Sequence, residues 1–142
     1  MILTRGHMHA SGICFGNFGV LISGASGQGK SHLALACMGV GAGLICDDMV
    51  EIDSHGTDIM ISPPQTAIAK IEVRGVGLID ARLSGPRPLQ LVVDLDQEEP
   101  ERLPKKHHAV FKQLRVRLIH AKNIPHLHYV IKQLAIGGTP QG

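Results

Sequence analysis

The residues best suited to chemistry form one short segment, 24–31, with the sequence Gly-Ala-Ser-Gly-Gln-Gly-Lys-Ser. A glycine, four free residues and then Gly-Lys-Ser is the pattern of a phosphate-binding loop. Its glycines let backbone N–H groups point inward at phosphate oxygens, while the lysine adds positive charge and the serine hydroxyl can ligate Mg²⁺. The segment therefore predicts a nucleotide site made of Gly24, Ala25, Ser26, Gly27, Gln28, Gly29, Lys30 and Ser31.

The flanking segments support this prediction. The apolar run 18–22 is expected to form a buried strand, and residues 30–38 a helix whose N-terminus faces the phosphates. The alternative is a loop that has kept the pattern and lost nucleotide binding. The strand before the loop and the helix after it make that alternative the weaker one.

Two adjacent carboxylates, Asp47 and Asp48, are the second candidate for chemistry. The pair begins 17 residues after Lys30, so one helix and one short strand (44–46) return it to the carboxyl edge of the sheet, beside the phosphates. One Asp could orient Mg²⁺ while the other accepts a proton from a hydroxyl nucleophile. The alternative is a turn whose Asp side chains hydrogen-bond the backbone, which is common at strand ends.

The composition is that of a folded protein with one core. The 142 residues are 44% apolar and 18% charged, which predicts a single domain over 1–142. A net charge of +2 and scarce aromatic residues argue against a nucleic-acid partner. Without a membrane-spanning stretch, a signal segment or a disulfide or zinc spacing among Cys14, Cys37 and Cys46, we expect a cytoplasmic protein with no membrane partner.

Apolar runs and turn residues predict an α/β fold with a mixed sheet and flanking helices. A polar turn is expected at 53–58, charged mobile surface at 97–108 and a frayed tail at 136–142. Residues 60–64 are expected to cross the edge of the sheet because two prolines cannot donate to a ladder. Besides 18–22 and the helix 30–38, the expected elements are strands at 9–15, 44–46, 50–52, 89–95 and 116–119 and a helix at 125–135.

Four blocks of the sequence together resemble the HPr kinase/phosphorylases. These enzymes phosphorylate a serine of the small phosphocarrier protein HPr and can reverse the reaction by phosphorolysis. His9 stands 15 residues before Gly24, which is the family's spacing for its active-site histidine. The phosphate loop, the hydrophobic-Asp-Asp block at 45–48 and the segment 71–80 match the family's other signatures. The resemblance covers about residues 9–80, with a weaker continuation to about 135.

The resemblance implies a P-loop-containing, phosphoenolpyruvate-carboxykinase-like fold, ATP and Mg²⁺ as cofactors, and HPr or an HPr-like carrier as partner. Asp47 would be the general base in the kinase direction and the general acid in the reverse direction, with His9 beside it to tune its charge. Asp48 and Glu72 would help Ser31 hold the metal. Arg74 would steady the active-site loop. The family assembles as a hexamer.

Several positions depart from the family's pattern. His32 replaces an acidic residue, Met49 replaces a common arginine, and the region 105–114 is shortened, so that Lys105 or Lys106 is a candidate for the missing substrate-contacting arginine. The C-terminal region used for assembly is also cut back, which leaves the oligomeric state open. A kinase of a small metabolite hydroxyl and a nucleotide-responsive binding module without turnover therefore stay open as alternatives.

Single residues also have plainer interpretations. Apart from the family's spacing, His9 would be a structural histidine of a strand, and Glu72 and Arg74 a surface ion pair. The pairs His107-His108 and His126-x-His128 are expected not to bind metal, because neither has a carboxylate or Cys partner at a useful spacing.

Overall fold

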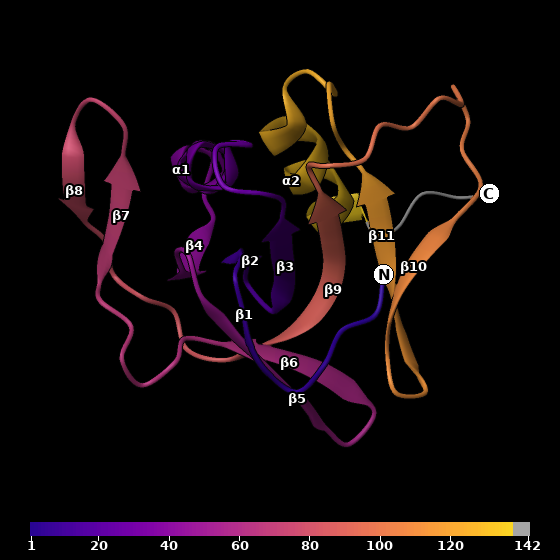
Figure 1. Ribbon diagram of the computed structural model, residues 1–142, viewed down its shortest axis with the longest axis horizontal. Helices are drawn as coiled ribbons and strands as arrows, with labels where there is room; N and C mark the ends of the chain where they lie inside the picture. The colour runs from indigo at the N-terminus through magenta and orange to yellow at the C-terminus, as the bar shows by residue number, and fades with distance from the viewer. Residues whose placement is uncertain (138–142) are drawn as a thin grey trace.

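Residues 1–137 fold mainly into strands, with two helices on one side (Figure 1). A computed structural model describes residues 1–137. The elements in chain order are β1 (Gly6–Met8), β2 (Ser11–Phe15), β3 (Phe18–Ser23), α1 (Lys30–Gly39), β4 (Gly43–Cys46), β5 (Val50–His55), β6 (Asp58–Ser62), β7 (Lys70–Val73), β8 (Gly77–Asp80), β9 (Arg87–Asp94), β10 (His107–Phe111), β11 (Leu114–His120) and α2 (Leu127–Gly137).

A nine-stranded mixed sheet is centred on β9. The sheet runs β1-β5-β6-β9-β3-β2-β4, and the β10–β11 hairpin joins it through β11 and β9. Strand β9 is parallel to β3 and β11 and antiparallel to β6. The predicted α/β fold with a mixed sheet and flanking helices is therefore confirmed. Strands β7 and β8 form a separate hairpin that projects from the body (Figure 1).

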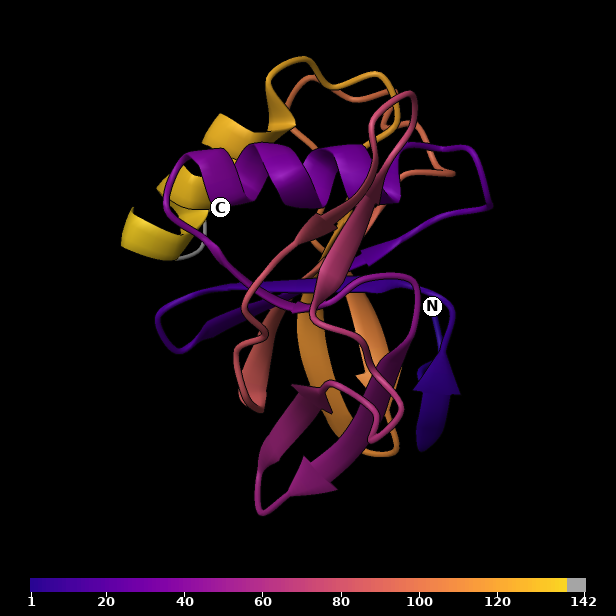
Figure 2. The ribbon, with the colours of Figure 1, turned by 90° about the vertical axis from the view of Figure 1, so that its left-hand side faces the viewer.

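The sheet has a hydrophobic core on each face. Alternating residues of β9 serve the two cores, because successive side chains of a strand point to opposite faces. Leu91 and Val93 pack with residues of α1 and α2, whereas Val92 packs on the other face with β5 and β6. Figure 2 shows the two helices on one side of the sheet and the β5–β6 hairpin on the other. A strand buried on both faces has the nearly continuous apolar sequence seen here.

Three parallel strands end at the same edge of the sheet. In the register, Ser23 at the end of β3 lies opposite Asp94 of β9, and Asp94 lies opposite His120 of β11. The chain leaves this edge in the phosphate loop after β3 and in the segment 95–106 after β9. This edge therefore gathers the side chains that follow the ends of all three strands.

The predicted strands at 9–15 and 18–22 correspond to β2 and β3, which pair as an antiparallel hairpin, and the predicted helix at 30–38 is α1. The predicted turn at 53–58 is found but is narrower: β5 continues to His55, and the chain turns at Gly56, whose φ of 62° suits glycine. Strand β6 lies inside the sheet rather than at its edge, because both prolines come after its last residue.

The predicted mobile surface at 97–108 is also wrong in part. Strand β10 begins at His107, and Glu98 forms a β-bridge with Ala121, so partners distant in sequence order this charged segment. Strand β1 was not predicted. Of the predicted tail 136–142, residues 136 and 137 belong to α2, and the rest lies outside the described residues.

Candidate active site

The phosphate loop joins the end of β3 to the start of α1, as the pattern predicts. Gly27 and Gly29 have φ values of 85° and 95°, a conformation that side-chain-bearing residues rarely adopt. Gly29 is also the residue that caps the start of α1. The loop therefore presents backbone N–H groups together with a helix N-terminus, and this combination favours a phosphate group.

Lys30 folds back over this loop. Its Nζ donates hydrogen bonds to the carbonyl oxygens of Gly24 at 2.7 Å and Ala25 at 3.2 Å. Only 7% of the residue is exposed, so the ammonium group is held inside the curl of the loop. This places one compact positive charge where the loop would receive anionic oxygens.

Asp47 is fixed by three donors from different elements. Its carboxylate accepts hydrogen bonds from Ser31 Oγ at 2.9 and 3.1 Å, from Ser11 Oγ at 2.8 Å and from the backbone N–H of Glu72 at 3.4 Å. The predicted return of the acidic pair to the phosphate loop is thus found. Sequence reasoning missed Ser11, because β2 lies beside β4 only in the folded sheet.

Asp48 behaves differently from its neighbour. Its φ of 73° turns the backbone, and its side chain is 74% exposed. His9 Nε2 lies 3.2 Å from Asp48 Oδ1, whereas the resemblance placed His9 beside Asp47. His9 also lies in the bend between β1 and β2 rather than in the predicted strand. The histidine is therefore paired with the outer acid of the pair.

A cleft of about 510 Å³ brings these groups together, lined by His9, Ser11, Ser26, Gly27, Gly29, Lys30, Ser31, His32, Asp48, Glu72 and Arg74. Glu72 comes from β7 and Arg74 from the turn that follows it. Within residues 1–137 these two side chains do not pair with each other, so the plain surface ion pair is not found. Met49 does not line this cleft. It lines an adjoining pocket of about 220 Å³ together with Asp47 and Asp48.

Asp96 is a further residue of the site that the sequence reasoning missed. Both of its carboxylate oxygens accept the backbone N–H of Ala25, at 3.1 and 3.0 Å, and its own N–H donates to Asp94 at 2.9 Å. The sequence did contain a signal, because Asp94 and Asp96 stand at the end of the apolar strand predicted at 89–95. Asp96 thus ties the segment after β9 to the phosphate loop.

Lys106 does not reach the cleft. It lines a separate pocket of about 350 Å³ with His108, Arg115 and Arg117. Burial and the neighbouring cations Arg115 and Arg117 lower the pKa of His108. Arg117 Nε and Nη1 find no hydrogen-bond partner within residues 1–137. In the single chain, Lys106 is therefore not a substitute for an active-site arginine.

A phosphate loop between a strand and a helix, with a carboxylate on the loop serine, defines an α/β domain of the P-loop type. The sequence profile of the HPr serine kinase C-terminal domain matches residues 2–133, and the chain belongs to this family. No helix within residues 1–137 is long and apolar enough to cross a membrane.

Relatives with known names agree with this family. The chain is 40% identical over 98 residues to the HPr kinase/phosphorylase of Bordetella pertussis, covering 61% of this chain and 32% of the relative. It is 37% identical over 92 residues to that of Geobacillus kaustophilus, covering 59% and 30%. The matches thus span about a third of the length of these curated relatives.

A solved structure shares the fold over nearly the whole chain. The HPr(Ser) kinase/phosphatase from Coxiella burnetii superposes with a TM-score of 0.77 at 25% sequence identity, covering 94% of this chain and 95% of that one. The fold expected from the resemblance is thereby confirmed.

Proposed function

We propose that this chain is the catalytic domain of an ATP-dependent serine kinase that phosphorylates HPr or an HPr-like phosphocarrier. The observation that carries the proposal is the contact of Ser31 with Asp47 at the start of α1, beside the His9–Asp48 pair in the same cleft. Family membership supports HPr as the substrate. We place the reaction in the cytoplasm, in regulation of a phosphotransferase relay.

The donor groups fit a nucleoside triphosphate with Mg²⁺. Residues 24–31 would hold the phosphates through backbone N–H groups and Lys30, and Arg74 on the cleft wall would add positive charge. Ser31 and Asp47 offer hard oxygen ligands at one point, with Glu72 nearby on the cleft wall. When bound, Mg²⁺ would neutralise charge that develops on the phosphate oxygens.

The two acids differ in how well they suit a general base. Asp47 is engaged by two serine hydroxyls and a backbone N–H, so we assign it to orient the metal. Asp48 is exposed in the cleft and paired with His9, so we assign the proton transfer to Asp48. This assignment exchanges the roles that the resemblance gave to Asp47 and Asp48.

In the kinase direction, Asp48 would take the proton of the substrate serine as its oxygen forms a bond to the γ-phosphorus. The bond from that phosphorus to the bridging oxygen breaks, and ADP leaves. In phosphorolysis, inorganic phosphate attacks the phosphoserine phosphorus, pyrophosphate forms, and protonated Asp48 returns a proton to the serine oxygen. His9 Nε2, at 3.2 Å from Asp48 Oδ1, would hold this carboxylate in position for the transfer.

The test is transfer of the γ-phosphoryl group from ATP to purified HPr with Mg²⁺, resolved by intact mass. We expect one phosphate on a serine of HPr. Asp48→Asn should slow transfer by about 10²- to 10⁴-fold, the range typical of general-base loss, while ATP affinity is kept. Asp47→Asn should instead raise the Mg²⁺ concentration needed for half-maximal rate.

Two other outcomes would redirect the proposal. If Asp48→Asn stays active while Asp47→Asn at saturating Mg²⁺ does not, the base is Asp47. If the wild-type chain binds ATP but puts no phosphate on any HPr-like carrier, a metabolite kinase or a binding module without turnover replaces the protein kinase. The hexamer of the family stays a prediction for this chain.

A further inference from the structure

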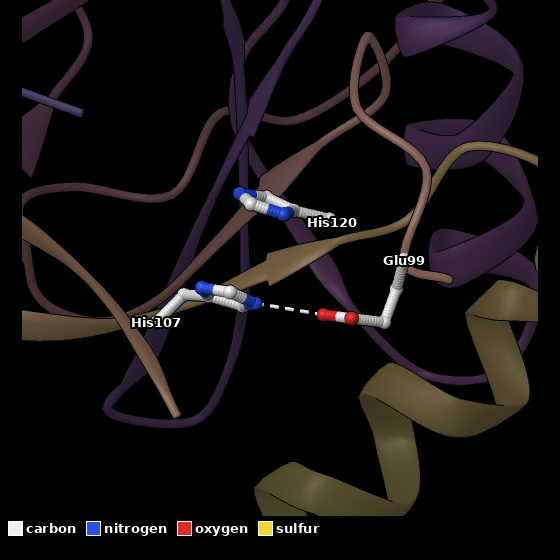
Figure 3. Close-up of side chains that lie close together, drawn as sticks. All are labelled: Glu99, His107 and His120. Carbon is white, nitrogen blue, oxygen red and sulfur yellow. Dashed lines mark hydrogen bonds and ion pairs between the residues drawn. The ribbon is translucent and has the colours of Figure 1, made fainter. Parts of the chain in front are cut away.

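Glu99, His107 and His120 form a compact cluster outside the nucleotide cleft (Figure 3). His107 Nε2 lies 2.7 Å from Glu99 Oε1, and the two imidazole rings stack with centroids 4.2 Å apart and planes 23° from parallel. One potential ligand atom from each residue lies within 4.8 Å of the other two. The side chains of Glu99 and His107 are only 14% and 34% exposed, so the cluster is partly shielded from water.

Backbone pairing sets the position of each member. His107 is the first residue of β10 and His120 the last of β11, and the antiparallel register brings them to the same end of the hairpin. Glu99 follows Glu98, which forms a bridge with Ala121 directly after His120. The three side chains are therefore held by the sheet rather than by a flexible loop alone. This anchoring is what a preorganised ligand site needs.

The chemistry of the cluster differs from that of the nucleotide cleft. Two imidazoles and one carboxylate form a ligand set of Zn²⁺ sites that leave a fourth position open, whereas Mg²⁺ prefers oxygen ligands alone. We propose that Glu99, His107 and His120 bind a divalent transition metal of the Zn²⁺ type. This inference is independent of the proposed kinase activity.

The geometry needs only small adjustments to accept such an ion. Bonds of about 2.0–2.1 Å in a tetrahedron place ligand atoms about 3.4 Å apart. The contact between Glu99 Oε1 and His107 Nε2 at 2.7 Å would open slightly, and the wider separations within the 4.8 Å group would close. Rotation of the side chains about their own bonds can supply such changes. Without a metal, His120 would contribute only the stacking of its ring on His107.

The metal would fasten a segment that also touches the phosphate loop. Glu99 lies three residues after Asp96, whose carboxylate accepts the N–H of Ala25. A bound ion would join this segment to the ends of β10 and β11. The expected consequence is a more stable protein in which the segment 95–106 resists local opening.

The test uses the whole chain without an affinity tag, in excess Mg²⁺ so that oxygen-ligand positions are occupied. Calorimetry with ZnCl₂ should show one more equivalent bound by the wild type than by His120→Ala. Glu99→Gln should weaken this binding by at least about 100-fold, beyond what loss of an outer contact usually costs. Co²⁺ in place of Zn²⁺ should give the visible bands of a four-coordinate ion in the wild type and not in His120→Ala.

His108→Ala is the matched control, because His108 follows His107 directly in β10 but lines the separate pocket with Lys106, Arg115 and Arg117. The His108→Ala variant should bind Zn²⁺ with the affinity of the wild type. Its melting temperature should rise on saturation with Zn²⁺ by the same amount. Melting curves in chelator show whether each variant is folded, and if His120→Ala is not, the conservative Glu99→Gln decides. Zinc uptake by the wild type equal to that of the folded Glu99→Gln variant would overturn the proposal and leave a plain ion pair.

Discussion

Two side-chain clusters follow the ends of parallel strands at one edge of the sheet, and they differ in their donor atoms. Near the end of β3, Ser31, Ser11 and Asp47 bring oxygen atoms together beside a helix N-terminus. At the end of β11, His120 joins His107 and Glu99 to make a cluster with two imidazoles. The two proposals thus assign two chemistries to one edge, because donor type rather than position in the fold selects the ion. Variants that affect one cluster and spare the other test this difference.

Lys30→Ala is expected to give the largest difference between the two clusters, with a loss of ATP binding and no change in zinc binding. Removal of the ammonium group takes away charge-assisted contacts to phosphate, which we expect to weaken ATP binding by about 10- to 150-fold. Calorimetry with Mg²⁺ and ATP measures the effect. Zinc binding at the His107 cluster should be unchanged in the same protein. Unaltered ATP affinity would contradict the assignment of the loop.

A substitution in the shared scaffold should damage both clusters. A Cβ added at Gly19 would lie 2.4 Å from the carbonyl oxygen of Pro88, so β3 and β9 could not keep their spacing. We expect Gly19→Ala to lower the free energy of unfolding by about 1–3 kcal/mol, measured by urea denaturation.

Gly39→Ala is the control for this scaffold variant. A Cβ there would meet no atom of residues 1–137 within 4 Å, and Gly39 is the last residue of α1. Its stability should stay the same or rise by up to about 1 kcal/mol, because alanine is the better helix former. Equal unfolding curves for the two variants would mean that β3 and β9 tolerate the added methyl group.

Asp96→Asn should have a smaller effect, confined to the nucleotide cluster. It replaces a charged acceptor of the Ala25 N–H by a neutral one, so the phosphate loop is held less firmly. We expect ATP affinity to fall by about three- to tenfold, because the contact is exposed to water. Fluorescence titration with a labelled nucleotide is sensitive enough. Zinc affinity should change less than twofold if the clusters act separately.

Treatment of the folded protein with a thiol-alkylating reagent is expected to have the smallest effect on either cluster. Burial raises the pKa of Cys37 from 9.0 to about 12, so the thiol is protonated at pH 8 and should resist alkylation in the folded protein. Mass spectrometry should find Cys37 labelled only after denaturation. Because the folded-state pKa is raised, its contribution to stability is present below about pH 9 and is lost as the pH rises towards about 12. Zinc binding should survive treatment of the folded protein, because no cysteine belongs to the proposed site.

Local sequence was sufficient for the cluster beside the phosphate loop. The phosphate loop, the helix after it and the return of Asp47 depend on neighbours within about one strand and one helix, and all three were predicted. The same locality explains the correctly predicted strands of the β2–β3 hairpin, which are separated by only two residues, Gly16 and Asn17. Residue type and short spacing carry this information because the backbone conformation of a loop or a helix is decided by nearby residues.

Tertiary structure decided which side chains meet across strands. The partner of His9 is Asp48 rather than Asp47 because the bend before β2 and the φ of 73° at Asp48 direct the two side chains towards each other. His107 and His120 gain the acidic partner that spacing did not show, because strand register and the Glu98–Ala121 bridge bring Glu99 to them. Sequence by itself therefore determined the loop, its helix and the family. Pairing between strands decided the contacts, because register depends on contacts between residues that are distant in the chain.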